Sequence, residues 1–100
     1  VAVPDDAPVF TATYKGNYAS IGDCTFARLQ RELGQVSLAH LSSQKAVQLS
    51  EGEYRGIRWT MEIRDVGDGT SSVVFRSYRA VWGPNFYADQ VRPSLEACVP

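Results

Sequence analysis

Two cysteines are the residues of this chain with the clearest chemical potential. Cys24 lies early in the first helical pattern, and Cys98 lies two residues before the C-terminal end. A disulfide between them would tie the first helix to the last and close most of the chain into one covalent loop. Because disulfides persist in oxidising compartments, this bond would indicate an exported protein. The alternative is a cytosolic protein whose two unrelated thiols are simply buried apolar side chains.

Redox or nucleophilic chemistry by the cysteines is disfavoured. Neither Cys24 nor Cys98 lies in a CxxC motif, and neither has a second cysteine nearby in the sequence to resolve a reaction intermediate. We therefore expect both cysteines to have a structural role.

The remaining catalytic and metal-binding patterns are weak. His40 is the only histidine, and Ser42 and Ser43 follow it too closely to face it in a strand; no GxSxG pattern occurs. Zinc-ligand spacings are absent. Asp65 and Asp68 resemble part of a calcium loop that lacks its bidentate glutamate. Because no credible catalytic set is present, we predict a protein that is not an enzyme and has no cofactor or metal. The alternative, an enzyme, would need a deep pocket around His40 with a carboxylate nearby.

Five residues form the candidate partner-binding set: Arg58, Arg64, Arg76, Tyr78 and Trp82. Arginine and aromatic side chains are enriched at protein interfaces. We predict that these residues bind a protein or a component of the cell envelope from an exposed sheet face.

The arginines have a simpler alternative explanation, a solvated strand face on which they pair with Glu53 and Glu62. The formal net charge is -1, whereas binding to nucleic acid normally needs a strong basic excess. We therefore expect no nucleic-acid partner, although an aromatic-rich sheet can stack single-stranded bases. No apolar run approaches the ~20 residues that span a bilayer, so we expect no transmembrane segment.

The elements that position these residues follow from the apolar periodicity. The patterns predict a strand at 9–14, a helix at about 20–33, a strand at 54–64, a strand at 73–82 and a last helix from about 85. Residues 65–70 predict a hairpin loop slightly longer than the tightest type. The span 35–53 remains open between one bent strand, two short strands and a partly helical segment.

Burial follows from the same patterns. Phe26, Leu29 and Leu33 predict the buried stripe of the first helix, with Ser20 and Asp23 approximating a capping box. In the strand at 54–64, apolar residues alternate with polar ones: Ile57, Trp59, Met61 and Ile63. The buried face of the strand at 73–82 is ambiguous. Pro93 predicts a kink or a break in the last helix.

The order of elements predicts an α+β fold. We expect a two-layer sandwich in which an antiparallel sheet of about four strands carries two helices on one face, in the order β-α-β-β-β-α. Residues 1–8 are a Pro- and Asp-rich tether, typical of a stem left after removal of an export signal or of an artificial chain boundary. Residues 9–100 form a single domain.

Several short segments resemble small exported proteins and lipoproteins of Gram-negative bacteria without assigned function. They are Tyr18-Ala19 through Asp23-Cys24, Trp82-Gly83-Pro84, Arg92-Pro93-Ser94-Leu95 and the terminal Cys98. The resemblance covers most of residues 9–99. It implies a periplasmic or secreted location and a Cys24–Cys98 bond, and it assigns no activity to any residue. Because position 1 is Val, a lipid anchor would lie upstream of the chain given.

Two functional hypotheses follow. The leading one is a non-enzymatic exported domain that binds a protein or envelope component through its exposed sheet face or through the corner around Trp82. The second is a small secreted inhibitor of a hydrolase, which would insert the loop at 66–70 into the enzyme cleft. The sequence leaves the oligomeric state open.

Overall fold

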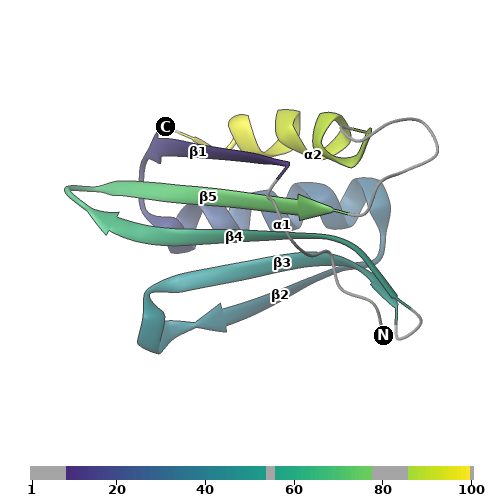
Figure 1. Cartoon of the computed structure of the whole chain (residues 1–100), viewed down its shortest axis with the longest axis horizontal. Helices are drawn as coiled ribbons and strands as arrows, with labels where there is room; N and C mark the ends of the chain where they lie inside the picture. Colours follow the sequence, from purple (N-terminus) through teal and green to yellow (C-terminus); the bar gives the residue numbers. More distant parts are fainter. Residues whose placement is uncertain (1–8, 54–55, 78–85, 100) are drawn as a thin grey trace.

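The computed structural model describes residues 9–53, 56–77 and 86–99. Its elements in chain order are β1 (Phe10–Lys15), α1 (Tyr18–Leu33), β2 (Val36–Leu41), the 3-10 turn η1 (Ser42–Gln44), β3 (Ala46–Glu53), β4 (Gly56–Gly67), β5 (Thr70–Ser77) and α2 (Phe86–Glu96). All five strands form one antiparallel sheet in the order β1-β5-β4-β3-β2. Both helices lie on one face of it (Figure 1). The predicted two-layer α+β fold is confirmed, with five strands in place of about four.

The additional strand comes from the span that the sequence left open. β2 and β3 are separate strands that pair antiparallel, with Leu41 opposite Ala46. The chain reverses through η1 and Lys45, whose φ of 52° lies in the left-handed region. Of the three alternatives for this span, two short strands is the correct one.

The β4–β5 hairpin is tighter than predicted. β4 continues to Gly67 through an irregularity in its pairing between Asp65 and Gly67. Asp68 and Gly69 alone form the turn, with φ of 57° and 68°. Positive φ at both central residues is the requirement of a two-residue type I′ turn, which Asp-Gly satisfies well. The expected longer loop is therefore wrong.

Helix α1 begins earlier than predicted because a different residue caps it. The Asn17 side chain accepts hydrogen bonds from the backbone N–H groups of Ala19 and Ser20, at 2.9 and 3.1 Å. This is the usual role of an N-cap asparagine, so the predicted cap at Ser20 is wrong. Gly34 ends the helix in the left-handed conformation, at φ 84°.

The buried face of α1 is rotated from the predicted stripe. Leu29 is fully buried, but Phe26 and Leu33 are only partly buried. The fully buried positions are Ile21, Gly22, Thr25 and Leu29. Gly22 explains the rotation, because a Cβ at this position would overlap the side chain of Val47 on β3. The helix therefore packs closest where it has no side chain.

The core lies between the sheet and the helices. Its buried apolar side chains are Ile21, Leu29, Val36, Val47, Leu49, Trp59, Met61, Ile63, Val73, Phe75, Ala88, Val91 and Leu95. The predicted inward face of β4 is confirmed for Trp59, Met61 and Ile63, whereas Ile57 is only partly buried. In β5 the ambiguity is settled, because Val73 and Phe75 point inward and Val74 points outward.

Helix α2 runs through Pro93 as one helix, so the expected break into two turns does not occur. The missing N–H of a proline removes only one backbone hydrogen bond, here late in the helix. The next two residues, Ser94 and Leu95, are buried against the fold, which holds the last turn in place. The tether at 1–8 and the predicted helix start at about residue 85 lie outside the described residues, and α2 begins at Phe86.

Candidate binding surface

A disulfide joins Cys24 and Cys98, as the sequence predicted. The two sulfur atoms are 2.05 Å apart and the two Cα atoms 5.7 Å apart, values that are ordinary for a disulfide. Cys24 is exposed on α1, off the buried stripe, and Cys98 is partly exposed just after α2. The bond therefore fixes the two helices to each other from their outer side.

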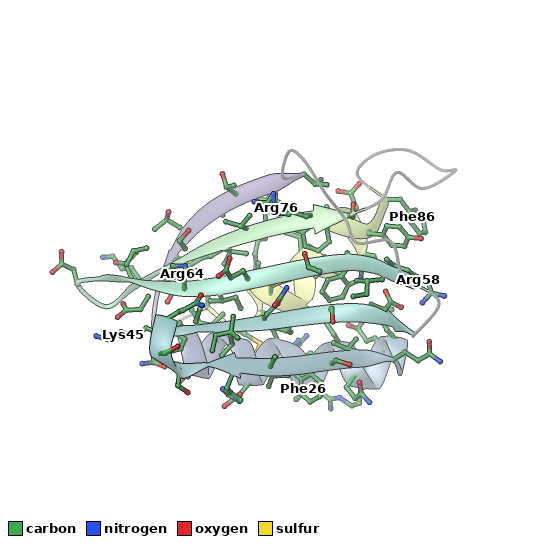
Figure 2. The ribbon with its side chains drawn as sticks, turned by 60° about the horizontal axis from the view of Figure 1, so that its bottom comes forward. Phe26, Lys45, Arg58, Arg64, Arg76 and Phe86 are labelled. Atoms are coloured by element: carbon green, nitrogen blue, oxygen red, sulfur yellow. A yellow bond between two sulfur atoms is a disulfide. The ribbon has the colours of Figure 1, made fainter. Side chains whose placement is uncertain are left out.

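The face of the sheet opposite the helices, here named the open face, is built by the alternate residues that point away from the core. One row across it runs from Gln48 to Glu62, Val74 and Thr11, which lie opposite one another on β3, β4, β5 and β1. Many side chains of the open face are short or carry hydroxyl groups: Thr11, Thr13, Ser37, Ala39, Ser50, Thr60 and Ser72. No described helix covers this face, as Figure 2 shows.

The three arginines of the candidate set are spread along this part of the sheet. Arg58 and Arg64 lie at opposite ends of β4, about 20 Å apart at the usual rise per residue. Arg76 lies opposite Thr60 on the neighbouring strand. Figure 2 shows the three labels at separate places over β4 and β5. They form a dispersed surface, and Tyr78 and Trp82, the aromatic members of the set, lie outside the described residues.

Arg64 is held in a local network. Its Nη2 donates to the Glu62 carboxylate and, at 3.3 Å, to the side-chain oxygen of Gln44. Its side chain remains 42% exposed. The pairing with Glu62 that the sequence offered as an alternative is therefore present. A paired arginine keeps unused N–H donors, so it still has hydrogen bonds to offer a partner.

Arg58 turns toward the end of the sheet. Its Nη1 lies 3.7 Å from the Glu51 carboxylate, whose side chain is only 10% exposed. Glu51 also accepts a hydrogen bond of 2.7 Å from the buried indole N–H of Trp59. The sequence analysis did not identify Glu51. Its spacing was a usable signal, because Glu51 continues the alternation of Val47 and Leu49, the core-facing residues of β3. The contact gives Arg58 a structural role in compensating a buried charge.

A second cluster that the sequence did not reveal joins β1 to α2. The Tyr14 hydroxyl and the Arg92 Nε both donate to Oε2 of Glu96, each at 3.0 Å. The Arg92 guanidinium lies 4.7 Å from the ring centroid of Phe10. Hydrogen bonds from Arg92 and then from Tyr14 lower the pKa of Glu96. Burial, followed by the Glu96 contact, raises the pKa of Tyr14.

His40 lies on β2 at the surface. Its side chain is 54% exposed and its Nε2 lies 3.7 Å from the Asp23 carboxylate. A catalytic histidine generally works in a concave site that excludes water, and this one is open to solvent. Among residues 9–53, 56–77 and 86–99, no group of three His, Cys, Asp or Glu side chains is arranged to hold a metal ion.

The tip of the β4–β5 hairpin carries the one large hydrophobic side chain that is exposed among the described residues. This is Val66, which is 55% exposed. The tip is braced by Gly16, whose N–H donates to the carbonyl of Gly69 at 2.7 Å and whose carbonyl accepts from the Ser71 hydroxyl at 2.8 Å. Val66 therefore lies on a hairpin whose turn is held by hydrogen bonds to Gly16 within the domain.

Comparison of the chain with models of protein families, with curated proteins and with solved structures finds no match. No helix in the described part of the chain is long and apolar enough to cross a membrane. The candidate surfaces of this chain therefore have to be assessed on their own geometry.

Proposed function

We propose that the protein is a non-enzymatic exported domain that binds another protein or a component of the cell envelope through its open face. The supporting observation is that both helices lie on one face of the sheet, while the other face presents short polar side chains and arginines. Hydroxyl groups and guanidinium groups offer many hydrogen bonds to a polar partner. The short side chains also lose little conformational entropy on binding.

Arginine is the charged residue that interfaces favour, and this supports the open face as the binding surface. A planar guanidinium can engage carboxylate or phosphate groups with two parallel hydrogen bonds. A partner with acidic groups is therefore the best match for the arginine-bearing part of this face. The exposed position of His40 is consistent with a binding function that involves no catalysis.

The disulfide supports the exported location, because such bonds persist in oxidising compartments. We further propose a periplasmic or secreted protein, with a lipid anchor upstream of Val1 as one means of retention at the envelope. The resemblance to small envelope proteins and lipoproteins agrees with this proposal.

The binding proposal is tested with two variants of equal charge change, Arg76→Glu on the open face and Arg31→Glu on the exposed side of α1. Each immobilised protein is exposed to an envelope extract, and bound proteins and polysaccharides are quantified. We expect Arg76→Glu to lower capture of the specific partner by about tenfold, the range of an interface hot spot. Arg31→Glu should retain it. Equal capture by both variants at unchanged melting temperature would remove the open face as the binding surface.

A second candidate function is inhibition of a secreted hydrolase by the β4–β5 hairpin, and the exposure of Val66 favours it. A rigid loop with an apolar tip loses little entropy on entering an enzyme cleft, so more of its contact energy contributes to affinity. In an assay of secreted hydrolases at micromolar protein, Val66→Asp should abolish any inhibition found. Ser43→Asp, at the exposed β2–β3 connection, is the matched control. Inhibition that survives Val66→Asp would contradict this mode of binding.

A further inference from the structure

The strand β2 forms one edge of the five-stranded sheet, and β1 forms the other. β2 consists of Val36–Leu41 and contains no Lys, Arg, Asp, Glu or Pro. Its pairing with β3 runs without a bulge. Edge strands usually carry a charge, a proline or a bulge, because an open edge is a template for pairing with another strand. β2 lacks these protective features.

Backbone contacts at the start of β2 define which residues face this edge. The carbonyl of Gln35 accepts a hydrogen bond of 3.3 Å from the N–H of Gly52, so Gln35 faces β3. The N–H of Val36 instead donates to the side-chain oxygen of Gln30 on α1, at 3.1 Å. Successive residues of a strand direct their N–H and C=O groups to opposite sides. Odd-numbered residues of β2 therefore face β3, and even-numbered ones face away from it.

By this alternation, Leu38 and His40 direct both their N–H and C=O groups to the outer edge of the sheet. No described strand lies beyond β2 to accept these groups. Two residues at i and i+2 supply two donors and two acceptors, the repeat that an added antiparallel strand requires. Val36 differs from them because its N–H already has a partner on α1.

The side chains around the edge are almost all neutral. Phe26 on α1 lies beside β2 (Figure 2) and is only partly buried. The Asp23 carboxylate on α1 lies near the strand, 3.7 Å from Nε2 of His40. The β1 edge differs, because Lys15 ends that strand and Arg92 lies over its Phe10 ring. Strand β2 itself therefore contributes no Lys, Arg, Asp or Glu side chain that would repel a second copy of it.

We propose that β2 pairs antiparallel with β2 of a second copy of this chain, forming a two-fold symmetric dimer with a continuous ten-stranded sheet. The observed backbone directions select a register in which Leu38 lies opposite His40 of the second copy. Four hydrogen bonds then form from the edge-facing groups of both copies. The alternative register with Leu38 opposite itself would also require the Val36 N–H, which is engaged by Gln30.

This register has consequences for Ala39 and Phe26. Ala39 is exposed on the open face, and the two-fold axis places it opposite Ala39 of the second copy. Residues opposite each other in such a non-hydrogen-bonded pair have Cα atoms about 4.5 Å apart. Phe26 from each copy lies alongside the junction and adds apolar area to it. The same pairing joins the open faces of both copies, and it does not depend on what those faces bind.

The first test measures mass in solution. A single pair of edge strands with flanking helix contacts makes a small interface, so we expect a dissociation constant in the micromolar range. Sedimentation equilibrium at protein concentrations up to ~1 mM measures it. Ala39→Lys places two like charges opposite each other and should shift the dimer to monomer. Thr13→Lys, an exposed threonine on β1, should leave it unchanged. A monomer at every concentration, or a dimer that is equally stable in Ala39→Lys, overturns the proposal.

The second test reads the register. In folded Ala39→Cys, mild oxidation should give a covalent dimer, because the new cysteines lie within disulfide distance across the axis. In Ser37→Cys the proposed register offsets the two introduced cysteines by four residues along the strand, about 14 Å, so they should not cross-link. Intact mass under non-reducing conditions distinguishes the two results. Equal cross-linking of both variants, or of neither, contradicts the proposed pairing.

Discussion

Removal of the Cys24–Cys98 bond is the sharpest perturbation that the structure offers. In a Cys24→Ala, Cys98→Ala variant little packing is lost, since Cys24 is exposed and Cys98 is partly exposed. The variant therefore isolates the effect of the cross-link on the unfolded chain. The two residues are separated by 74 positions, and a loop of this length contributes about 4 kcal/mol in the chain-entropy model.

This free energy is large for a domain of 100 residues, because net stabilities of small proteins are about 5–15 kcal/mol. At the usual unfolding entropy per residue it corresponds to a fall in the melting temperature of about 20 °C. The unfolded chain without its cross-link is also more expanded. We therefore expect the urea m-value, which follows the surface exposed on unfolding, to rise in the variant.

Urea titration followed by circular dichroism measures both quantities in one experiment. The parent protein in dithiothreitol is the control, and it should reproduce the stability and the m-value of the double variant. A loss of stability below ~1 kcal/mol, or a large loss with an unchanged m-value, would refute an effect that acts through loop entropy. The second result would instead indicate that native contacts near the bond carry the stabilisation.

Two further predictions concern the packing of α1 and the contact between β1 and α2. Gly22→Ala should destabilise the fold by about 1–2 kcal/mol in urea titrations, because overpacking against Val47 outweighs the helix propensity of alanine. Val47→Ala should then cost less stability in the Gly22→Ala background than in the parent protein, because it removes the overlapping side chain. An equal cost in both backgrounds would contradict this explanation. Glu96 has its pKa lowered by Arg92 and Tyr14, so its contribution to stability is present above the unfolded pKa of the carboxyl and is lost as pH falls through the lower folded pKa. Glu96→Gln should therefore flatten the acid limb of stability against pH, whereas an unchanged limb would exclude a role for this carboxylate.

The sequence predicted the fold class because parts of the chain have a single clear phase. In β4 the residues Trp59, Met61 and Ile63 are apolar and their neighbours are polar, so the sequence predicted that one face of the strand is buried. β5 lacked this contrast, because Val74 on the open face is as apolar as Val73 in the core. The phase of β5 was decided by its partners on both sides, which a single strand does not show.

The β2–β3 connection and the contacts around Glu51 and Glu96 could not be predicted from the sequence, for different reasons. The reversal after β2 uses Lys45 in a left-handed conformation, and lysine does not mark a turn as glycine or asparagine does. The contact of Tyr14 with Glu96 joins residues from opposite ends of the chain. The candidate arginines could be named from their outward phase, but the turn of Arg58 toward Glu51 depends on the irregular pairing near Gly52.

The position of the disulfide also determines how the domain would respond to tension. Every strand except β1 lies between Cys24 and Cys98, together with α2 and most of α1. A load pulling the two chain ends apart would pass directly through the sulfur–sulfur bond near the C-terminal end. Only β1 and the first turns of α1 could detach and lengthen the chain, while the disulfide would prevent the segment from β2 to α2 from being extended.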